Sequence, residues 1–295
     1  MRDLSMAPKV VNSAEIGRHP ALASLREMYA YRGLIGELVR RDLKLRYKNS
    51  IGGVLWSLLN PLMQIGVLTV LMKFILTNPV KNYSAYLFVL FLWNFVQVCV
   101  NDGCVAVLSN ASLVRKIYFP RSILPLVSLI GNFIHFGIAF AFTIVYFFVL
   151  GAYPQQLRIW FLMVVPVVLC AVMLCLGISY ILSYLNVLYE DVRFIVGALL
   201  SVFFYALPII YPIENVYAYP HRYVLYMLNP VATLLVCYQR ALLSPIVVAD
   251  KFGVTLAHPP FPWPFLGLAF VESLVILIIG FKLFDRYQWE IAERL

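Results

Sequence analysis

Residues 159–188 read IWFLMVVPVVLCAVMLCLGISYILSYLNVL, a run without a single Asp, Glu, Lys or Arg. A helix of about 20 apolar residues crosses the hydrocarbon core of a bilayer. Because lipid offers the backbone no hydrogen-bond partners, only helices and closed β-barrels span it. The run shows no alternation of apolar and polar residues, so it predicts a transmembrane helix.

Five further apolar runs extend this prediction to an all-α integral membrane protein with six transmembrane helices. The expected spans are 53–76, 84–108, 122–150, 159–188, 194–211 and 263–284. We expect one transmembrane domain over 29–295. Residues 1–28 lack the apolar core of a signal peptide and are expected to form a cytoplasmic tail.

The overall composition excludes most soluble proteins. Hydrophobic residues make up 62% of the chain, charged residues 13%, and the mean hydropathy is +0.85. Soluble domains carry about 45–50% apolar and about 25% charged residues. The five cysteines lie in apolar runs without zinc-ligand spacing, so we interpret them as packing residues and expect no metal site.

Residues 212–244 are expected to form a re-entrant external hairpin. Asn229-Pro230 divides the apolar stretch there into two pieces that are each too short to cross a bilayer. With six spans and both termini in the cytoplasm, 17 of the 23 Lys and Arg residues fall in the cytoplasmic segments. This distribution follows the positive-inside rule.

A basic amphipathic helix is predicted over 29–50, before the first span. Tyr31, Leu34, Ile35, Leu38 and Leu45 share an apolar arc, and most of the charged residues lie opposite. Such a helix suits the surface of an anionic membrane. Asp42 falls inside the apolar arc, and we expect it to pair with Arg46, four residues on. The helix serves either as a membrane anchor or as a site where some of its cations bind an anionic lipid-linked substrate.

Two other segments have chemistry of interest. The loop 110–120 is basic and aromatic, with Leu113, Tyr118 and Phe119 expected to face the cytosol, and it predicts a protein contact unless its rings only mark the membrane interface. Phe203, Phe204 and Tyr211 would share one face of the fifth span. They are either packing residues or part of a ring-lined path for a sugar chain.

Catalytic motifs are few. The chain has no GxxxxGK[ST] phosphate loop, so it does not hydrolyse ATP by that route. Asp102, His135 and Glu272 are single polar groups within predicted spans, either bonded between helices or functional. A proton-coupled carrier using these three is one alternative, although such carriers often show two similar halves, which this chain lacks. A membrane-embedded glycosyl- or phosphotransferase is another, but it would need a convergent cluster of acids or a metal.

Five motifs carry a resemblance to a known family. They are LVRRDLKLRYKNSIGGVLWSLLNPL at 38–62, NASLVRKIYFPRSILP at 110–125, LNVLYEDVR at 185–193, NP at 229–230 with QRAL at 239–242, and FKLFDRY at 281–287. In this order they resemble the polysaccharide-exporting ABC-2-type permeases. The chain departs from the pattern at Glu190, where Arg is expected, and at Gly53, where Leu is usual.

The resemblance implies a half-transporter of the bacterial cytoplasmic membrane. Two copies would pair with two cytoplasmic ATPase subunits that bind Mg-ATP, with no cofactor on this chain and no nucleic acid as partner. The cargo would be a lipid-linked glycan such as an O-antigen, capsular polysaccharide or teichoic acid. A small-molecule exporter of the same superfamily is the alternative.

The residue patterns and the resemblance together give three sets of expected site residues. The pyrophosphate of the lipid-linked substrate would be bound by Arg40, Arg41, Lys44 and Arg46. A channel at the dimer interface would be lined by Trp56, Phe203, Phe204 and Tyr211, with the hairpin 212–244 gating its outer mouth. The ATPase would be contacted by Leu113, Arg115, Lys116, Tyr118 and Phe119.

Overall fold

A computed structural model describes residues 28–48, 55–71, 74, 87–117, 119–149, 161–242 and 260–294. These residues form helices and turns without a strand, which confirms the all-α prediction. The helices are α2 Arg32–Tyr47, α3 Leu55–Val70, α5 Val89–Val105, α6 Ala111–Lys116, α7 Ile123–Val149, α9 Val164–Leu188, α10 Val192–Ala206, α11 Glu214–Tyr217, α12 Pro220–Met227, α13 Pro230–Leu242 and α14 Trp263–Arg294. The predicted tail lies outside the described residues, apart from Met28.

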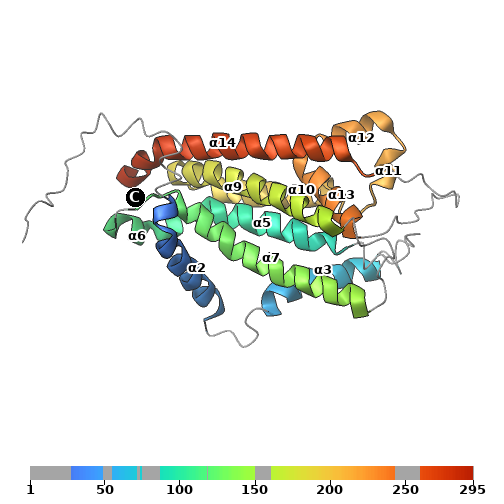
Figure 1. The fold of residues 1–295 in the computed structure, drawn as a ribbon, viewed down its shortest axis with the longest axis horizontal. Coiled ribbons are helices and arrows are strands. Elements are labelled where there is room, and N and C mark those ends of the chain that lie inside the picture. Colours follow the sequence, from blue (N-terminus) through green and yellow to red (C-terminus); the bar gives the residue numbers. More distant parts are fainter. Residues whose placement is uncertain are drawn as a thin grey trace, which may run out of the picture.

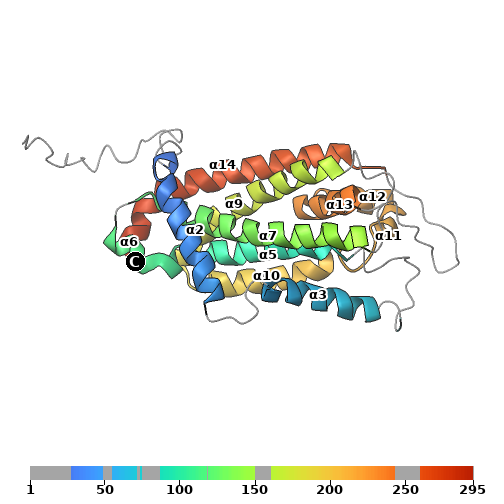
Figure 2. The same cartoon turned by 60° about the horizontal axis from the view of Figure 1, so that its bottom comes forward.

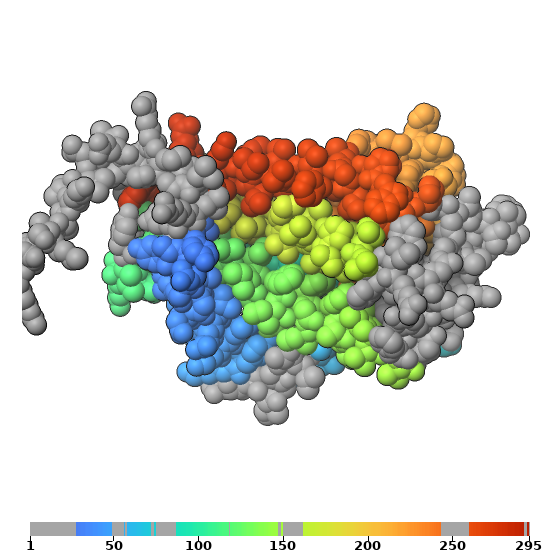
Figure 3. Space-filling model, in the orientation of Figure 1, coloured from blue at the N-terminus to red at the C-terminus, as the bar shows by residue number. Residues whose placement is uncertain are grey.

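Helices α5, α7, α9 and α14 run along the length of the molecule (Figure 1). On the side seen in Figure 3, α14, α9 and α7 form successive bands, with α2 across one end. Helices α9 and α14 touch backbone to backbone, because a Cβ atom on Gly177 would lie 2.6 Å from the amide nitrogen of Leu277. Small residues permit such close approach between helices in membranes.

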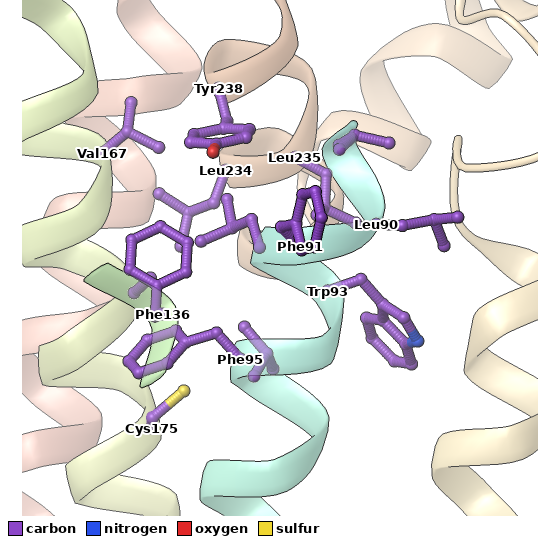
Figure 4. Close-up of a cluster of buried hydrophobic side chains, with 14 of the residues drawn as sticks. Leu90, Phe91, Trp93, Phe95, Phe136, Val167, Cys175, Leu234, Leu235 and Tyr238 are labelled. Atoms are coloured by element: carbon purple, nitrogen blue, oxygen red, sulfur yellow. The ribbon is translucent and has the colours of Figure 1, made fainter. Parts of the chain in front are cut away.

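Aromatic side chains fill the core between these helices. Phe91 and Phe95 of α5, Phe136 of α7 and Tyr238 of α13 gather there (Figure 4). The Phe95 and Phe136 ring centroids lie 5.0 Å apart. All five cysteines are free and buried, as expected of packing residues.

Three helical stretches are long and apolar enough to cross a membrane: Ile123–Tyr146, Val164–Leu188 and Trp263–Ile291. A fourth results if α5 and the following Leu108–Lys116 count as one span bent by 53°. Within the expected spans 53–76 and 194–211, the described residues form two shorter apolar helices, α3 and α10. The described residues therefore contain three to four candidate spans.

Helix α10 ends five residues before the expected end of its span. Its last residue is Ala206, and Leu207 adopts an extended conformation with ψ of 157°. The next residue is Pro208, and a proline disfavours helical geometry in the residue that precedes it. Tyr211 therefore lies beyond the helix, and the prediction that it shares a helical face with Phe203 and Phe204 is wrong.

The expected hairpin 212–244 contains three helices, α11, α12 and α13. Helix α13 is almost entirely buried and packs against α5, α9 and α14. The Asn229 side chain accepts a 3.0 Å hydrogen bond from the Val231 amide, so the Asn-Pro pair begins α13 by capping it. Helices α11 and α12 lie at one end of the bundle. Helix α6 and the C-terminal turns of α14 lie at the other (Figures 1 and 2).

Candidate functional surfaces

Helix α2 crosses the bundle obliquely near the end that carries α6 (Figure 2). It packs on α7 and buries Leu38 and Val39. Leu45 of the expected apolar arc is 59% exposed and does not pack against the bundle.

The four cations of α2 that were expected to bind the substrate divide into two pairs with different surroundings. Two nitrogens of Arg41 donate to Asp42 Oδ1, at 3.2 and 2.9 Å, and Arg41 also bonds the side chain of Asn110. Arg46 donates to Asp102 Oδ2 at 2.7 Å and to Asn132 Oδ1 at 2.9 Å. The expected Asp42–Arg46 pair is therefore wrong. A neighbour four residues along a helix contributes only about 0.2–0.5 kcal/mol, less than hydrogen bonds between charged groups on different helices.

Arg40 and Lys44 instead lie beside a shallow, open hollow on the surface of α2. The other lining residues are Gly36, Val39, Leu43 and Tyr47, all on α2. Arg40 meets Glu37 at 3.4 Å, but both side chains are largely exposed to solvent, so this ion pair is weak. Two cations beside apolar side chains suit an anionic group attached to a lipid chain.

The structure gives partners to two of the three polar groups in the expected spans. Asp102 accepts from Arg46 and, at 3.0 Å, from Asn132 Nδ2. The Tyr47 hydroxyl lies 3.0 Å from His135 Nε2. Glu272 is half-buried on α14, and no described contact joins it to the other two. The three groups thus do not form the single site that a proton-coupled carrier would use.

The loop 110–120 contains α6, whose last turn carries Arg115 and Lys116. Both cations are exposed, and Leu113 is half-buried. Phe119 is only 5% exposed and belongs to a core cluster with Phe284 and Ile291, so the expectation that it faces the cytosol is wrong. Its ring turns inward where the chain enters α7 through Pro120. Tyr118 lies outside the described residues.

A pocket of about 210 Å³ opens beside α6. Arg115, Lys116 and Arg121 line it together with Val114, Ile117 and Phe119. Arg121 also donates to the Gln288 carbonyl and lies over the Trp289 ring, which ties the start of α7 to the end of α14. The pocket therefore combines three cations with apolar side chains, and one of these cations, Arg121, is held in place by α14.

The four expected channel residues lie in unlike environments. Trp56 on α3 is 61% exposed and Phe203 on α10 is 40% exposed. Phe204 packs toward the core, with its ring centroid 6.5 Å from that of Trp93. The Tyr211 hydroxyl donates to the Ala206 carbonyl at 2.8 Å, beside Tyr226 of α12. Trp56 and Phe203 are thus exposed, while Phe204 and Tyr211 hold α10 in place.

Sequence reasoning missed one buried ion pair. Arg240 Nη2 of α13 lies 2.8 Å from Glu214 Oε1 of α11, and the two side chains are 14% and 5% exposed. Burial raises the pKa of the nearby Tyr223, and Arg240 opposes that rise. The sequence held a signal for this pair, because Glu214 and Asp250 are the only acids between residues 192 and 271 and an isolated acid in an apolar stretch needs a partner.

No cluster of three or more His, Cys, Asp or Glu side chains is placed to hold a metal ion within the described ranges. The bundle of long apolar helices is that of a multi-pass membrane protein.

A model of the ABC-2 type transporter family matches residues 33–243, and the chain belongs to that family. It is a transport subunit, and ATP hydrolysis resides on a separate subunit. The chain is 30% identical over 272 residues to the O-antigen export system permease protein RfbA of Myxococcus xanthus, covering 91% of this chain and 98% of that protein. A protein of the same name from Klebsiella pneumoniae is 24% identical over 262 residues, covering 88% and 94%.

Proposed function

We propose that this chain is the permease subunit of an ABC exporter that moves a lipid-linked polysaccharide across the bacterial cytoplasmic membrane. The observation that carries the proposal is the nearly full-length similarity to a permease named for O-antigen export. Among the three expected glycans, that similarity favours an O-antigen. Separate ATPase subunits with Mg-ATP supply the energy.

The proposed topology has six spans with both termini in the cytoplasm. The arrangement of the ends supports it, because α6 and the end of α14 lie opposite α11 and α12. In this topology α11 and α12 form the external gate. Helix α10 has 15 residues and is about 22 Å long at 1.5 Å per residue, so it reaches most of the way across the hydrocarbon core.

A second copy of the chain would complete the transporter. Helices α3 and α10 both pack on α5, and each leaves apolar side chains exposed. Exposed members include Trp56, Met63 and Val67 on α3, and Leu199, Val202 and Phe203 on α10. In the proposed dimer, Trp56 and Phe203 line the path of the glycan, while Phe204 and Tyr211 support α10 from behind.

Arg40 and Lys44 are the proposed contacts for the substrate pyrophosphate. They line the hollow on α2, whereas Arg41 and Arg46 already have partners on other helices. The apolar side chains of Val39 and Leu43 would face the lipid chain. Leu113, Arg115, Lys116 and Tyr118 are the proposed ATPase contacts, and the buried Phe119 anchors the loop from within.

Reconstitution tests the proposed function. The chain would be co-purified with its ATPase subunits and placed in vesicles with extracted lipid-linked O-antigen. We expect ATP-dependent transfer of the glycan across the vesicle membrane, measured by its accessibility to a glycan-cleaving enzyme. A complex with a hydrolysis-deficient ATPase is the control. Transport of small hydrophobic compounds without any glycan transfer would instead establish the small-molecule exporter.

A further inference from the structure

Helix α5 and the following segment, which carries the expected ATPase contacts of α6, meet at a sharp bend. Helix α5 ends at Val105, and the segment Leu108–Lys116 leaves it at 53°. Ala106 and Val107, the two residues in the bend, are almost fully buried. They belong to the same core cluster as Leu38 and Val39 of α2, so α2 helps to cover the bend.

Two arginines of α2 bond to opposite sides of this bend. Arg46 donates to Asp102, three residues before the end of α5, at 2.7 Å. Arg41 donates to Asn110, the residue that directly precedes α6. One rigid helix thus contacts the chain before and after the bend.

Each guanidinium group is also held by a second partner. Asp42 accepts from two nitrogens of Arg41. Asn132, which is buried on α7, accepts from Arg46 and donates to Asp102, so these three side chains form a closed set of hydrogen bonds. The second partner therefore holds each arginine side chain in the orientation that bonds its acceptor at the bend.

The spacing of the four groups depends on the bend. Arg41 and Arg46 are separated by about 7.5 Å along α2, five residues at 1.5 Å each. Asp102 and Asn110 would be about 12 Å apart along a straight helix. Because Arg46 and Arg41 contact the chain on opposite sides of the bend, a movement of α6 relative to α5 would shift Asn110 relative to Asp102, so that α2 would move with it or one of the two contacts would break.

We propose that α2 is a bridge across the α5–α6 bend, formed by Arg46–Asp102 on one side and Arg41–Asn110 on the other, which transmits movement of α6 to Arg40 and Lys44. The inference rests on the proposed function for both ends of this connection. Asp102 and Asn110 are positioning residues in it, since they act through the two arginines.

The test compares variants at Asn110 in the reconstituted complex. Asn110→Asp keeps an acceptor within reach of Arg41, whereas the Asn110→Ser side chain is too short to reach it. The readout is the ratio of ATPase activity with lipid-linked O-antigen to activity without it. We expect Asn110→Asp to keep this ratio and Asn110→Ser to lower it at least about fivefold, the lower end of typical coupling between two sites.

The other side of the bridge provides a second test. Asp102→Asn should lower the same ratio, and the exchange Arg46→Asp with Asp102→Arg should restore part of it. Arg294→Ala is the matched control, because Arg294 pairs with Glu290 on its own helix.

Three outcomes decide between the alternatives. If the wild-type complex shows no response to the glycan, the proposed function fails. If the wild type responds and both single variants respond equally well, the bridge is wrong. If Asn110→Ser and Asp102→Asn lose assembly with the ATPase, the contacts serve folding alone, and the bridge is wrong as well.

Discussion

At the scale of single residues, neighbours decide what each cation of α2 does. Arg41 and Arg46 are occupied by side chains of other segments, and Arg40 and Lys44 remain beside an open hollow. The sequence predicted the four cations as one set, because the acceptors that set Arg41 and Arg46 apart, Asn110 and Asp102, lie 69 and 56 residues away along the chain. Periodicity along one helix carries no information about such distant partners.

The replacement of Arg40 and Lys44 by Gln tests the substrate site. Each charged hydrogen bond to a phosphate contributes about 1.5–3 kcal/mol, so we expect at least about a tenfold loss of glycan-stimulated ATPase activity. Complex yield should stay unchanged, because neither side chain is buried. Lys282→Gln, which removes an exposed cation from α14, is the control. An equal response in both variants would show that general surface charge, and not this hollow, attracts the substrate.

Phe119 illustrates a different kind of error. Its position in a basic and aromatic loop suggested an exposed contact, but its ring fills the core at the end of the bundle. We expect Phe119→Ala to destabilise the protein by about 3–5 kcal/mol, as is usual for a buried ring. Thermal unfolding of the detergent-solubilised protein measures this. Ile117→Ala, two residues away at a side chain that is 52% exposed, should change stability by less than about 0.5 kcal/mol. Comparable losses in the two variants would contradict the burial of Phe119.

At the scale of helices, the close contact of α9 with α14 depends on two glycines. A Cβ atom on Gly177 would collide with backbone atoms of Ile276 and Leu277, and one on Gly280 would collide with the Gly177 carbonyl. Backbone atoms cannot move aside as the flexible end of a side chain can, so an added Cβ atom at either glycine would push the two helices apart.

We therefore expect Gly177→Ala to lower the stability of the protein by about 1–3 kcal/mol, the usual cost of overpacking. The melting temperature in detergent and the yield of folded protein measure the effect. Gly137→Ala on α7 is a matched control, because a Cβ atom there would meet nothing within 4 Å. If both variants melt at the same temperature, α9 and α14 are not packed as closely as described.

Hydropathy predicted that helices exist, but it could not predict all of their ends or partners. It identified α7, α9 and α14 because long apolar runs have few alternatives. It placed the end of α10 at residue 211, although Pro208 was the local signal for an earlier end. It gave 212–244 as one re-entrant external hairpin and could not predict its internal packing, in which α13 contacts α5, α9 and α14 and is joined to α11 through Glu214 and Arg240.

At the scale of the whole molecule, the two ends of the bundle have different roles in the proposed exporter. One end carries the cations of α2 and the exposed Arg115 and Lys116 of α6. The other carries α11 and α12, which Tyr226 joins to the end of α10 through the Ala206 carbonyl. The distribution of basic residues predicted this polarity, since 17 of 23 Lys and Arg residues lie in the segments assigned to the cytoplasm.

Single introduced cysteines test this polarity directly. The native cysteines are all buried, so an introduced one at a surface site reacts first with a membrane-impermeant maleimide. Arg115 and Tyr219 are both exposed and lie toward opposite ends of the bundle, on α6 and just before α12. We expect Tyr219→Cys to react in intact spheroplasts, whereas Arg115→Cys should react only in inverted vesicles. The unmodified chain is the background control. Reaction of both positions from the same side would contradict the six-span topology, because the chain between them must then cross the membrane an even number of times.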